Sequence, residues 1–95
     1  MLFVAVCNDR AGGLPLRLET RPAHLAWIET LGPAVKAAGP FVGPDGQPNG
    51  SMIVIEADDE AACRALLARD PYALKGLFDT VSLRPWRWLI KNPEA

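Results

Sequence analysis

The chain is 95 residues long and its charges nearly balance, with 10 Lys and Arg against 11 Asp and Glu. This length suits one small domain, so we expect residues 1–95 to form a single domain. A net charge of −1 gives no electrostatic basis for nucleic-acid binding. No apolar run approaches the roughly 20 residues of a membrane-spanning helix. We therefore expect neither a nucleic-acid partner nor a membrane partner.

The redox compartment is indicated by the two cysteines. Cys7 and Cys63 stand alone in apolar surroundings, and the first residues lack the basic start and cleavage pattern of a secretory signal. One disulfide remains open, but free thiols in a cytoplasmic protein fit this pattern better.

The first expected element is a central strand, because residues 2–7 form an apolar run that ends at a turn-forming segment. Such a run predicts burial on both faces. Residues 9–21 contain two glycines and a proline, which predicts a mobile connection. Its arginines (Arg10, Arg17 and Arg21) could close over an anion, although loop arginines are mostly solvated.

The first helix is expected to start at Thr20-Arg21-Pro22 and to run to about residue 38, where Gly39-Pro40 ends it. Its apolar face carries His24, Ile28, Leu31 and Val35. This places His24 in the first turn, where the helix dipole favours a neutral imidazole. Pro33 predicts a bend, or a break after Thr30.

A hairpin and a second helix follow. Phe41 and Val42 begin a short strand, residues 43–50 form a turn-rich link, and residues 51–57 form a second core strand. Asp58, Asp59 and Glu60 then open a helix, because acidic side chains cap and stabilise a helix N-terminus.

The second helix must stop at Asp70-Pro71-Tyr72, because Pro71 disfavours helical geometry at the residue before it. Residues 73–77 predict one more helical turn, and residues 78–90 a long strand. Pro85 makes this an edge strand or a strand with a bulge. Residues 92–95 form a tail.

The element order β-α-β-β-α-β predicts an α+β, ferredoxin-like fold. We expect a four-stranded antiparallel sheet with the first and third strands central and both helices on one face. The other face would be an apolar surface too large for a stable monomer, so we expect a homodimer whose two sheets pack together. Trp86 and Trp88 fit such an interface.

Two side chains stand out as candidates for proton transfer. His24 is the single histidine of the chain, and Asp70 lies on a stiff corner. The alternatives are a histidine bonded to a backbone carbonyl and an aspartate that bonds nearby amides. In the simple fold plan the two lie at opposite ends of the sheet. They meet only if the loops fold back or if a second subunit supplies one of them.

Other site types find little support. One histidine and no Cys-x-x-Cys motif do not make a zinc site, so we expect no metal, and nicotinamide and flavin fingerprints are missing, so we expect no cofactor. Tyr72 fits a pocket wall, since an ordinary phenol titrates near ~10. Ser51 lacks a nucleophile elbow and fits a hydrogen-bond donor to a ligand.

Several short segments together resemble the YCII-related (YciI-like) family of dimeric α+β barrel proteins. They are Thr20-Arg21-Pro22-Ala23-His24-Leu25, Ala38-Gly39-Pro40, Gly50-Ser51, Asp59-Glu60-Ala61-Ala62, Asp70-Pro71-Tyr72 with Gly76-Leu77, and Arg84-Pro85-Trp86. The resemblance spans nearly the whole chain. It implies a dimeric α+β barrel with a pocket that holds a histidine and an aspartate, by position His24 and Asp70. Some relatives are dehydrochlorinase-like enzymes that act on small aromatic or chlorinated compounds.

The leading hypothesis is therefore a cofactor-independent enzyme that performs acid–base chemistry on a small anionic or aromatic molecule. His24 would transfer the proton, Asp70 would orient the imidazole, and Arg21, Ser51 and Tyr72 would bind the substrate. Elimination, isomerisation and hydrolysis all fit. The alternatives are a non-catalytic ligand-binding or accessory module and a purely structural dimer.

Overall fold

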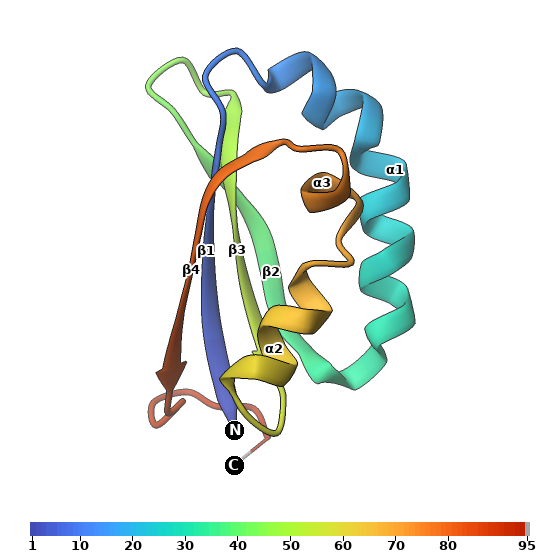
Figure 1. Cartoon of the computed structure of the whole chain (residues 1–95). Helices are drawn as coiled ribbons and strands as arrows, with labels where there is room; N and C mark the ends of the chain where they lie inside the picture. Colours follow the sequence, from blue (N-terminus) through green and yellow to red (C-terminus); the bar gives the residue numbers. More distant parts are fainter. Residues whose placement is uncertain (95) are drawn as a thin grey trace.

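Four strands form one antiparallel sheet in the computed structural model, which describes residues 1–94 (Figure 1). The strands are β1 (Leu2–Asp9), β2 (Val35–Val42), β3 (Pro48–Glu56) and β4 (Phe78–Trp86), and their order across the sheet is β2-β3-β1-β4. Helices α1 (Leu14–Leu31), α2 (Glu60–Leu67) and α3 (Pro71–Leu74) all lie on the same side of the sheet. The predicted ferredoxin-like β-α-β-β-α-β fold is confirmed, with the first and third strands central.

The core lies between the sheet and the helices. Alternate side chains of β1 point into it, so that Phe3, Ala5 and Cys7 are buried while the residues between them are only half-buried. Antiparallel pairing with β3 sets Phe3 opposite Ile55 and Ala5 opposite Ile53, which are also buried. The prediction that β1 is buried on both faces is therefore wrong for the single chain, because no layer formed by residues 1–94 covers its second face.

The first helix differs from the prediction at both ends. It begins at Leu14 rather than Thr20, with Pro15 in its first turn and Pro22 inside it, so most of the expected mobile connection is helical. The helix has no side-chain N-cap, whereas Thr20-Arg21-Pro22 resembles a helix start. It ends at Leu31, one residue beyond the break that Pro33 predicted, where Gly32 takes a positive φ of 55°.

The remaining elements follow the predicted order with shifted ends. A short 3₁₀ helix, η1 (Gly32–Ala34), leads into β2, which begins at Val35 and not at Phe41. β4 ends at Trp86 and not at Ile90, and it is an edge strand, as Pro85 predicted. Asp59 caps α2 by accepting a hydrogen bond from the backbone N–H of Ala62 at 2.8 Å.

The structure also bears on the state of the two cysteines and on membrane-spanning helices. Cys7 and Cys63 are both buried and are free thiols. Within residues 1–94, no helix combines the length and the apolar composition needed to span a membrane.

Candidate functional site

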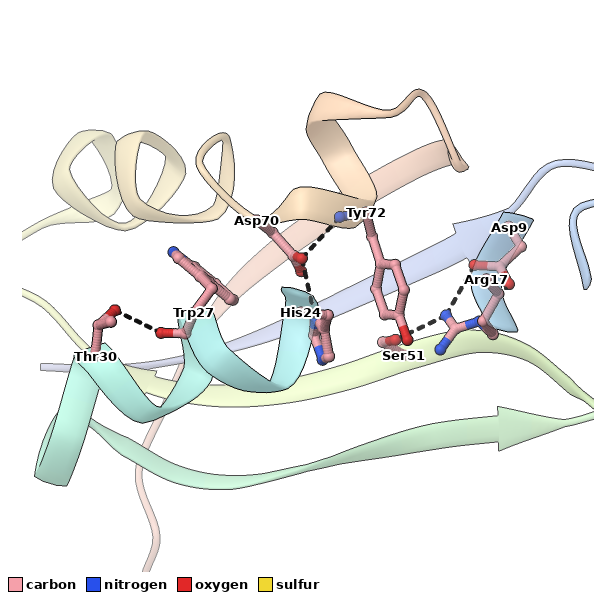
Figure 2. A network of polar contacts seen from close by, with 8 residues as sticks. All are labelled: Asp9, Arg17, His24, Trp27, Thr30, Ser51, Asp70 and Tyr72. Carbon is pink, nitrogen blue, oxygen red and sulfur yellow. Dashed lines mark hydrogen bonds and ion pairs between the residues drawn. The ribbon is translucent and has the colours of Figure 1, made fainter. Parts of the chain in front are cut away.

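His24 and Asp70 meet within one chain. The Nδ1 atom of His24 lies 2.8 Å from the Oδ1 atom of Asp70, and the two side chains are 10% and 1% exposed (Figure 2). The expected separation by the length of the sheet is wrong, because His24 lies in the middle of α1 and not in its first turn. The helix-dipole argument for a neutral imidazole fails for the same reason.

Asp70 is held in place by the turn that it begins. Pro71 is the first residue of α3, and the Oδ1 atom of Asp70 also accepts the backbone N–H of Tyr72 at 3.0 Å, which makes Asp70 the N-cap of α3. The sequence alternative, a helix-end aspartate that bonds nearby amides, is thus true together with the contact to His24. One oxygen makes both bonds.

Tyr72 forms the wall of the site beside His24. Its ring stacks on the imidazole with 4.1 Å between centroids and 16° between planes, and the guanidinium carbon of Arg17 lies 4.5 Å from its centroid. Burial raises the pKa of the Tyr72 phenol above its ordinary value, and the nearby charge of Arg17 only partly opposes this. The phenol is therefore protonated at neutral pH, and Tyr72 lines the cavity.

A second network of buried polar side chains is centred on Arg17. Its guanidinium donates two hydrogen bonds to Asp9, at 2.7 Å and 2.9 Å, and a third of 2.8 Å to the Oγ atom of Ser51 (Figure 2). Burial lowers the pKa of Arg17, but the hydrogen bonds and charge of Asp9 outweigh it and raise the pKa above its ordinary value. Arg17 therefore remains charged and paired.

His24, Tyr72, Arg17 and Ser51 line one cavity of about 280 Å³ between α1 and the sheet. Its polar lining comes from His24, Arg17, Arg21, Ser51 and Tyr72. Its apolar lining comes from α1 and from the two strands below it, namely Leu18, Leu25, Ile28, Ala38, Gly39, Pro40, Pro48 and Ile53. A hollow of this kind, apolar with a few convergent polar groups, is typical of a small-molecule site.

Of the five predicted site residues, four line the cavity and one lies behind it. His24, Arg21, Ser51 and Tyr72 line the cavity, whereas Asp70 is fully buried behind His24 and does not line it. Arg21 is exposed, and no ion pair joins it to another side chain of residues 1–94.

Sequence reasoning missed the pair of Arg17 and Asp9. The sequence pattern predicts Arg17 to be one of three loop arginines and gives no signal at Asp9, whereas Arg17 lies in α1. The spacing of residues 17, 21, 24 and 28 would have placed them on one helical face, had Pro15 been recognised as a first-turn proline.

The YCII-related domain family matches residues 1–87. The chain belongs to the YCII-related family. The YciI proteins of Escherichia coli O6:H1 and Shigella flexneri are each 33% identical to it, over 92% of this chain and 97% of theirs.

This YCII-related protein shares its fold with solved structures of dimeric α+β barrel proteins. A 5-chloro-2-hydroxyhydroquinone dehydrochlorinase from Burkholderia phenoliruptrix AC1100, in complex with 2,5-dihydroxybenzoquinone, matches with a TM-score of 0.85 and 30% identity, over 92% of this chain and 94% of that chain. A NIPSNAP domain protein from Burkholderia xenovorans matches with a TM-score of 0.54 and 18% identity, over 98% and 99%, and this likeness concerns the fold alone.

Proposed function

We propose that this YCII-related protein is an enzyme that performs acid–base chemistry on a small anionic or aromatic molecule bound in the cavity beside α1. His24 transfers the proton and Asp70 positions the imidazole. The observation that carries this proposal is the buried contact of 2.8 Å between His24 and Asp70, made by a histidine that also lines the cavity.

The contact with Asp70 determines which ring nitrogen is available. A carboxylate only accepts hydrogen bonds, so Nδ1 carries the hydrogen, and in the neutral ring Nε2 has the free electron pair. Figure 2 shows this second nitrogen directed away from Asp70, and it hydrogen-bonds to no protein atom within residues 1–94. Nε2 can therefore accept a proton from a ligand, and the negative charge of Asp70 then stabilises the imidazolium.

The size and lining of the cavity support a small, partly apolar substrate. Leu25, Ile28 and Ile53 contact one side of such a molecule, while Arg21 offers a positive charge. The dehydrochlorinase neighbour, which is 30% identical, supports an elimination reaction on a hydroxylated, chlorinated ring. In such a step a base removes a proton and chloride leaves with the electron pair of the carbon–chlorine bond. Isomerisation and hydrolysis use the same proton transfer.

We also propose that the protein acts as a homodimer. The sheet face away from the helices carries Phe41 and Met52, each 37% exposed, and Trp86, 41% exposed. The fold shared with dimeric α+β barrel proteins supports the packing of two such faces against each other. Such packing leaves the cavity on the helix side of each sheet.

The test is a comparison of His24→Gln and Asp70→Asn with the wild type, on chlorinated hydroxyquinols, phenols and small keto or hydroxy acids. General acid–base catalysis contributes roughly 10²- to 10⁴-fold, so His24→Gln is expected to lower kcat by about this factor. Asp70→Asn is expected to lower kcat less, because the imidazole remains. Glu29→Gln, an exposed change on the same helix, is the matched control.

Two outcomes contradict the proposal in different ways. Full turnover by His24→Gln would show that another group transfers the proton. A wild-type protein that binds these compounds but converts none of them would be the non-catalytic ligand-binding module of the alternative hypothesis.

A further inference from the structure

A second cavity, of about 190 Å³, lies between the two short helices and the half of the sheet that β1 and β4 form. Residues of β1 and β4 line it on the sheet side, and residues of α2 and α3 line it on the helix side. It shares no lining residue with the cavity beside α1. The two cavities are therefore separate, and the proposed function makes no use of this one.

Small side chains leave the second cavity open. Ala68 and Ala73 line it from the helices and Cys7 lines it from β1, while the larger Leu67 and Phe78 complete its apolar wall. An empty apolar cavity lowers the stability of a protein, because the atoms that line it lose dispersion contacts. A ligand of matching shape restores these contacts.

The charge of the lining is positive. Among the lining residues in the described part of the chain, Arg64 alone is charged, and its side chain is 53% exposed. It pairs with Glu60 at 3.5 Å, but an exposed pair of this kind contributes little, so the guanidinium can turn to another anion at small cost. The thiol of Cys7, which is 1% exposed, is neutral because burial raises its pKa to about 12.

Volume and charge together define a class of ligand. An apolar cavity of about 150 Å³ is large enough for benzene. A cavity of about 190 Å³ therefore admits one six-membered ring with a small substituent. Phe78 offers such a ring an aromatic contact, and Arg64 offers paired hydrogen-bond donors to a carboxylate.

Phe78 also connects the second cavity to His24. Its ring meets the ring of Tyr72 edge to face, with 5.9 Å between centroids and 73° between planes, and Tyr72 in turn stacks on the imidazole. Tyr72 and Ala73 are consecutive residues of α3, and they line the first and the second cavity, respectively. A ligand that displaces Phe78 or α3 therefore moves the ring beside His24.

We propose that the second cavity is a regulatory site for an aromatic carboxylate of a single ring, whose binding shifts Tyr72 against His24 through Phe78 and α3. This goes beyond the proposed function, because neither the site nor its ligand takes part in the proton transfer. The two cavities would thus communicate through one short helix.

Benzoate is the probe for the second cavity, and NMR of labelled methyl groups reports where it binds. The methyl signals of Leu67 and Val81 belong to the second cavity, and those of Ile28 and Ile53 to the first. We expect benzoate to shift the signals of Leu67 and Val81, with a Kd on the order of 1 mM for a ligand of so few atoms. Shifts confined to Ile28 and Ile53 would overturn the proposal.

Two pairs of variants test the lining. Ala73→Leu fills the cavity and should abolish the shifts, whereas Ala65→Leu, the same change at an exposed position of α2 outside the cavity, should not. Arg64→Gln should raise the Kd of benzoate about tenfold, because a hydrogen bond to a charged group is lost. Arg69→Gln, at an exposed arginine outside the cavity, is its control. Thermal unfolding checks that each variant is folded, and the exposed Arg64→Gln remains decisive if Ala73→Leu does not fold.

Benzamide tests whether the site selects a carboxylate, because it has the shape of benzoate without the charge. Its Kd should be the same in the wild type and in Arg64→Gln. An equal loss of affinity for benzoate and benzamide would show that Arg64 acts by packing alone, and would overturn the assignment of the ligand class.

The ring signals of His24 test the connection between the two cavities. They should shift with benzoate in the wild type and stay fixed in Ala73→Leu. A shift that persists in Ala73→Leu would show that benzoate reaches His24 directly, and signals that stay fixed in the saturated wild type would show that His24 does not sense the second cavity. Either result would overturn the regulatory role. None of these measurements uses turnover, so the loss of activity in His24→Gln tests the proposed function separately.

Discussion

Asp70 combines two tasks in one carboxylate oxygen. Oδ1 caps α3 through the backbone N–H of Tyr72 and also accepts the bond from His24. Because the cap fixes the position of the carboxylate, the hydrogen bond to it fixes the tautomer and the plane of the imidazole. The stacked Tyr72 ring supports the same orientation. A short local motif, Asp-Pro-Tyr, thus orients the side chain of a residue 46 positions earlier in the chain.

At the same scale, the raised pKa of the Cys7 thiol predicts how the free energy of unfolding depends on pH. Burial, with a smaller contribution from the charge of Asp70, raises the pKa of the Cys7 thiol from 9.0 to about 12. Above pH 9 the unfolded chain therefore loses this proton while the folded chain keeps it. The stabilising contribution is complete below pH 9 and is lost as the pH rises towards 12.

We expect the free energy of unfolding to fall between pH 9 and 11, and to fall less steeply in Cys7→Ala. Urea denaturation at several pH values, under reducing conditions, measures this. Iodoacetamide at pH 8 should leave the native thiols of Cys7 and Cys63 unmodified, because both are buried, and should label them in urea. Equal pH slopes for the two proteins would show that Cys7 titrates normally.

At the scale of elements, the length of α1 decides which residues share the cavity. The helix begins at Leu14, so Arg17, Arg21 and His24 lie on successive turns of one continuous helix rather than on a loop followed by a helix. A rigid helix holds these side chains at fixed spacings above β3, which carries Ser51. The cavity is therefore preformed in the single chain.

A second prediction at this scale concerns the stability of helix α2, whose N-cap residue does not line the cavity. Asp59→Ala removes the acceptor for the Ala62 N–H and should lower the free energy of unfolding by about 1 kcal/mol. Asp58→Ala, one residue earlier, should change it by less than about 0.5 kcal/mol. Ligand affinity should be the same in both variants. Urea denaturation and calorimetry check these results, and equal losses at the two positions would contradict the cap.

At the scale of the whole molecule, only one of the two faces of the sheet is covered by helices. One face is packed under three helices, while no layer of residues 1–94 covers the other face of the four strands (Figure 1). The half-buried face of β1 is the central part of this surface. A homodimer that pairs the open faces accounts for the apolar character of residues that a single chain leaves exposed.

Met52→Asp should separate such a dimer without unfolding the chain. Met52 is 37% exposed in the single chain, so a charge there costs the fold little, whereas two buried carboxylates at a dimer interface cost much more. Leu74→Asp, at a leucine of α3 that is 71% exposed, is the control. Light scattering after size-exclusion chromatography should give a dimer mass for the wild type and Leu74→Asp, and a monomer mass for Met52→Asp. A dimer that persists in Met52→Asp would show that another surface is used.

Much of the fold could be predicted because local signals agree with it. The apolar run of β1, the acidic start of α2, the Asp70-Pro71-Tyr72 corner and the proline of an edge strand each specify an element by short-range sterics or capping. The ends of α1 and β2 could not be predicted in this way. Gly13 gives α1 no side-chain cap, and Val35 continues the helical spacing by coincidence although it begins a strand.

The sequence by itself determined the order of elements, the family and the identity of the two groups that meet, His24 and Asp70. Only the tertiary structure decided that they meet within one chain, and that Arg17 is a buried partner of Asp9 and Ser51 rather than a solvated loop residue. The physical reason is that capping and periodicity act within a few residues along the chain. Contacts between residues 46 or 34 positions apart depend on where α1 starts and on how the sheet carries it.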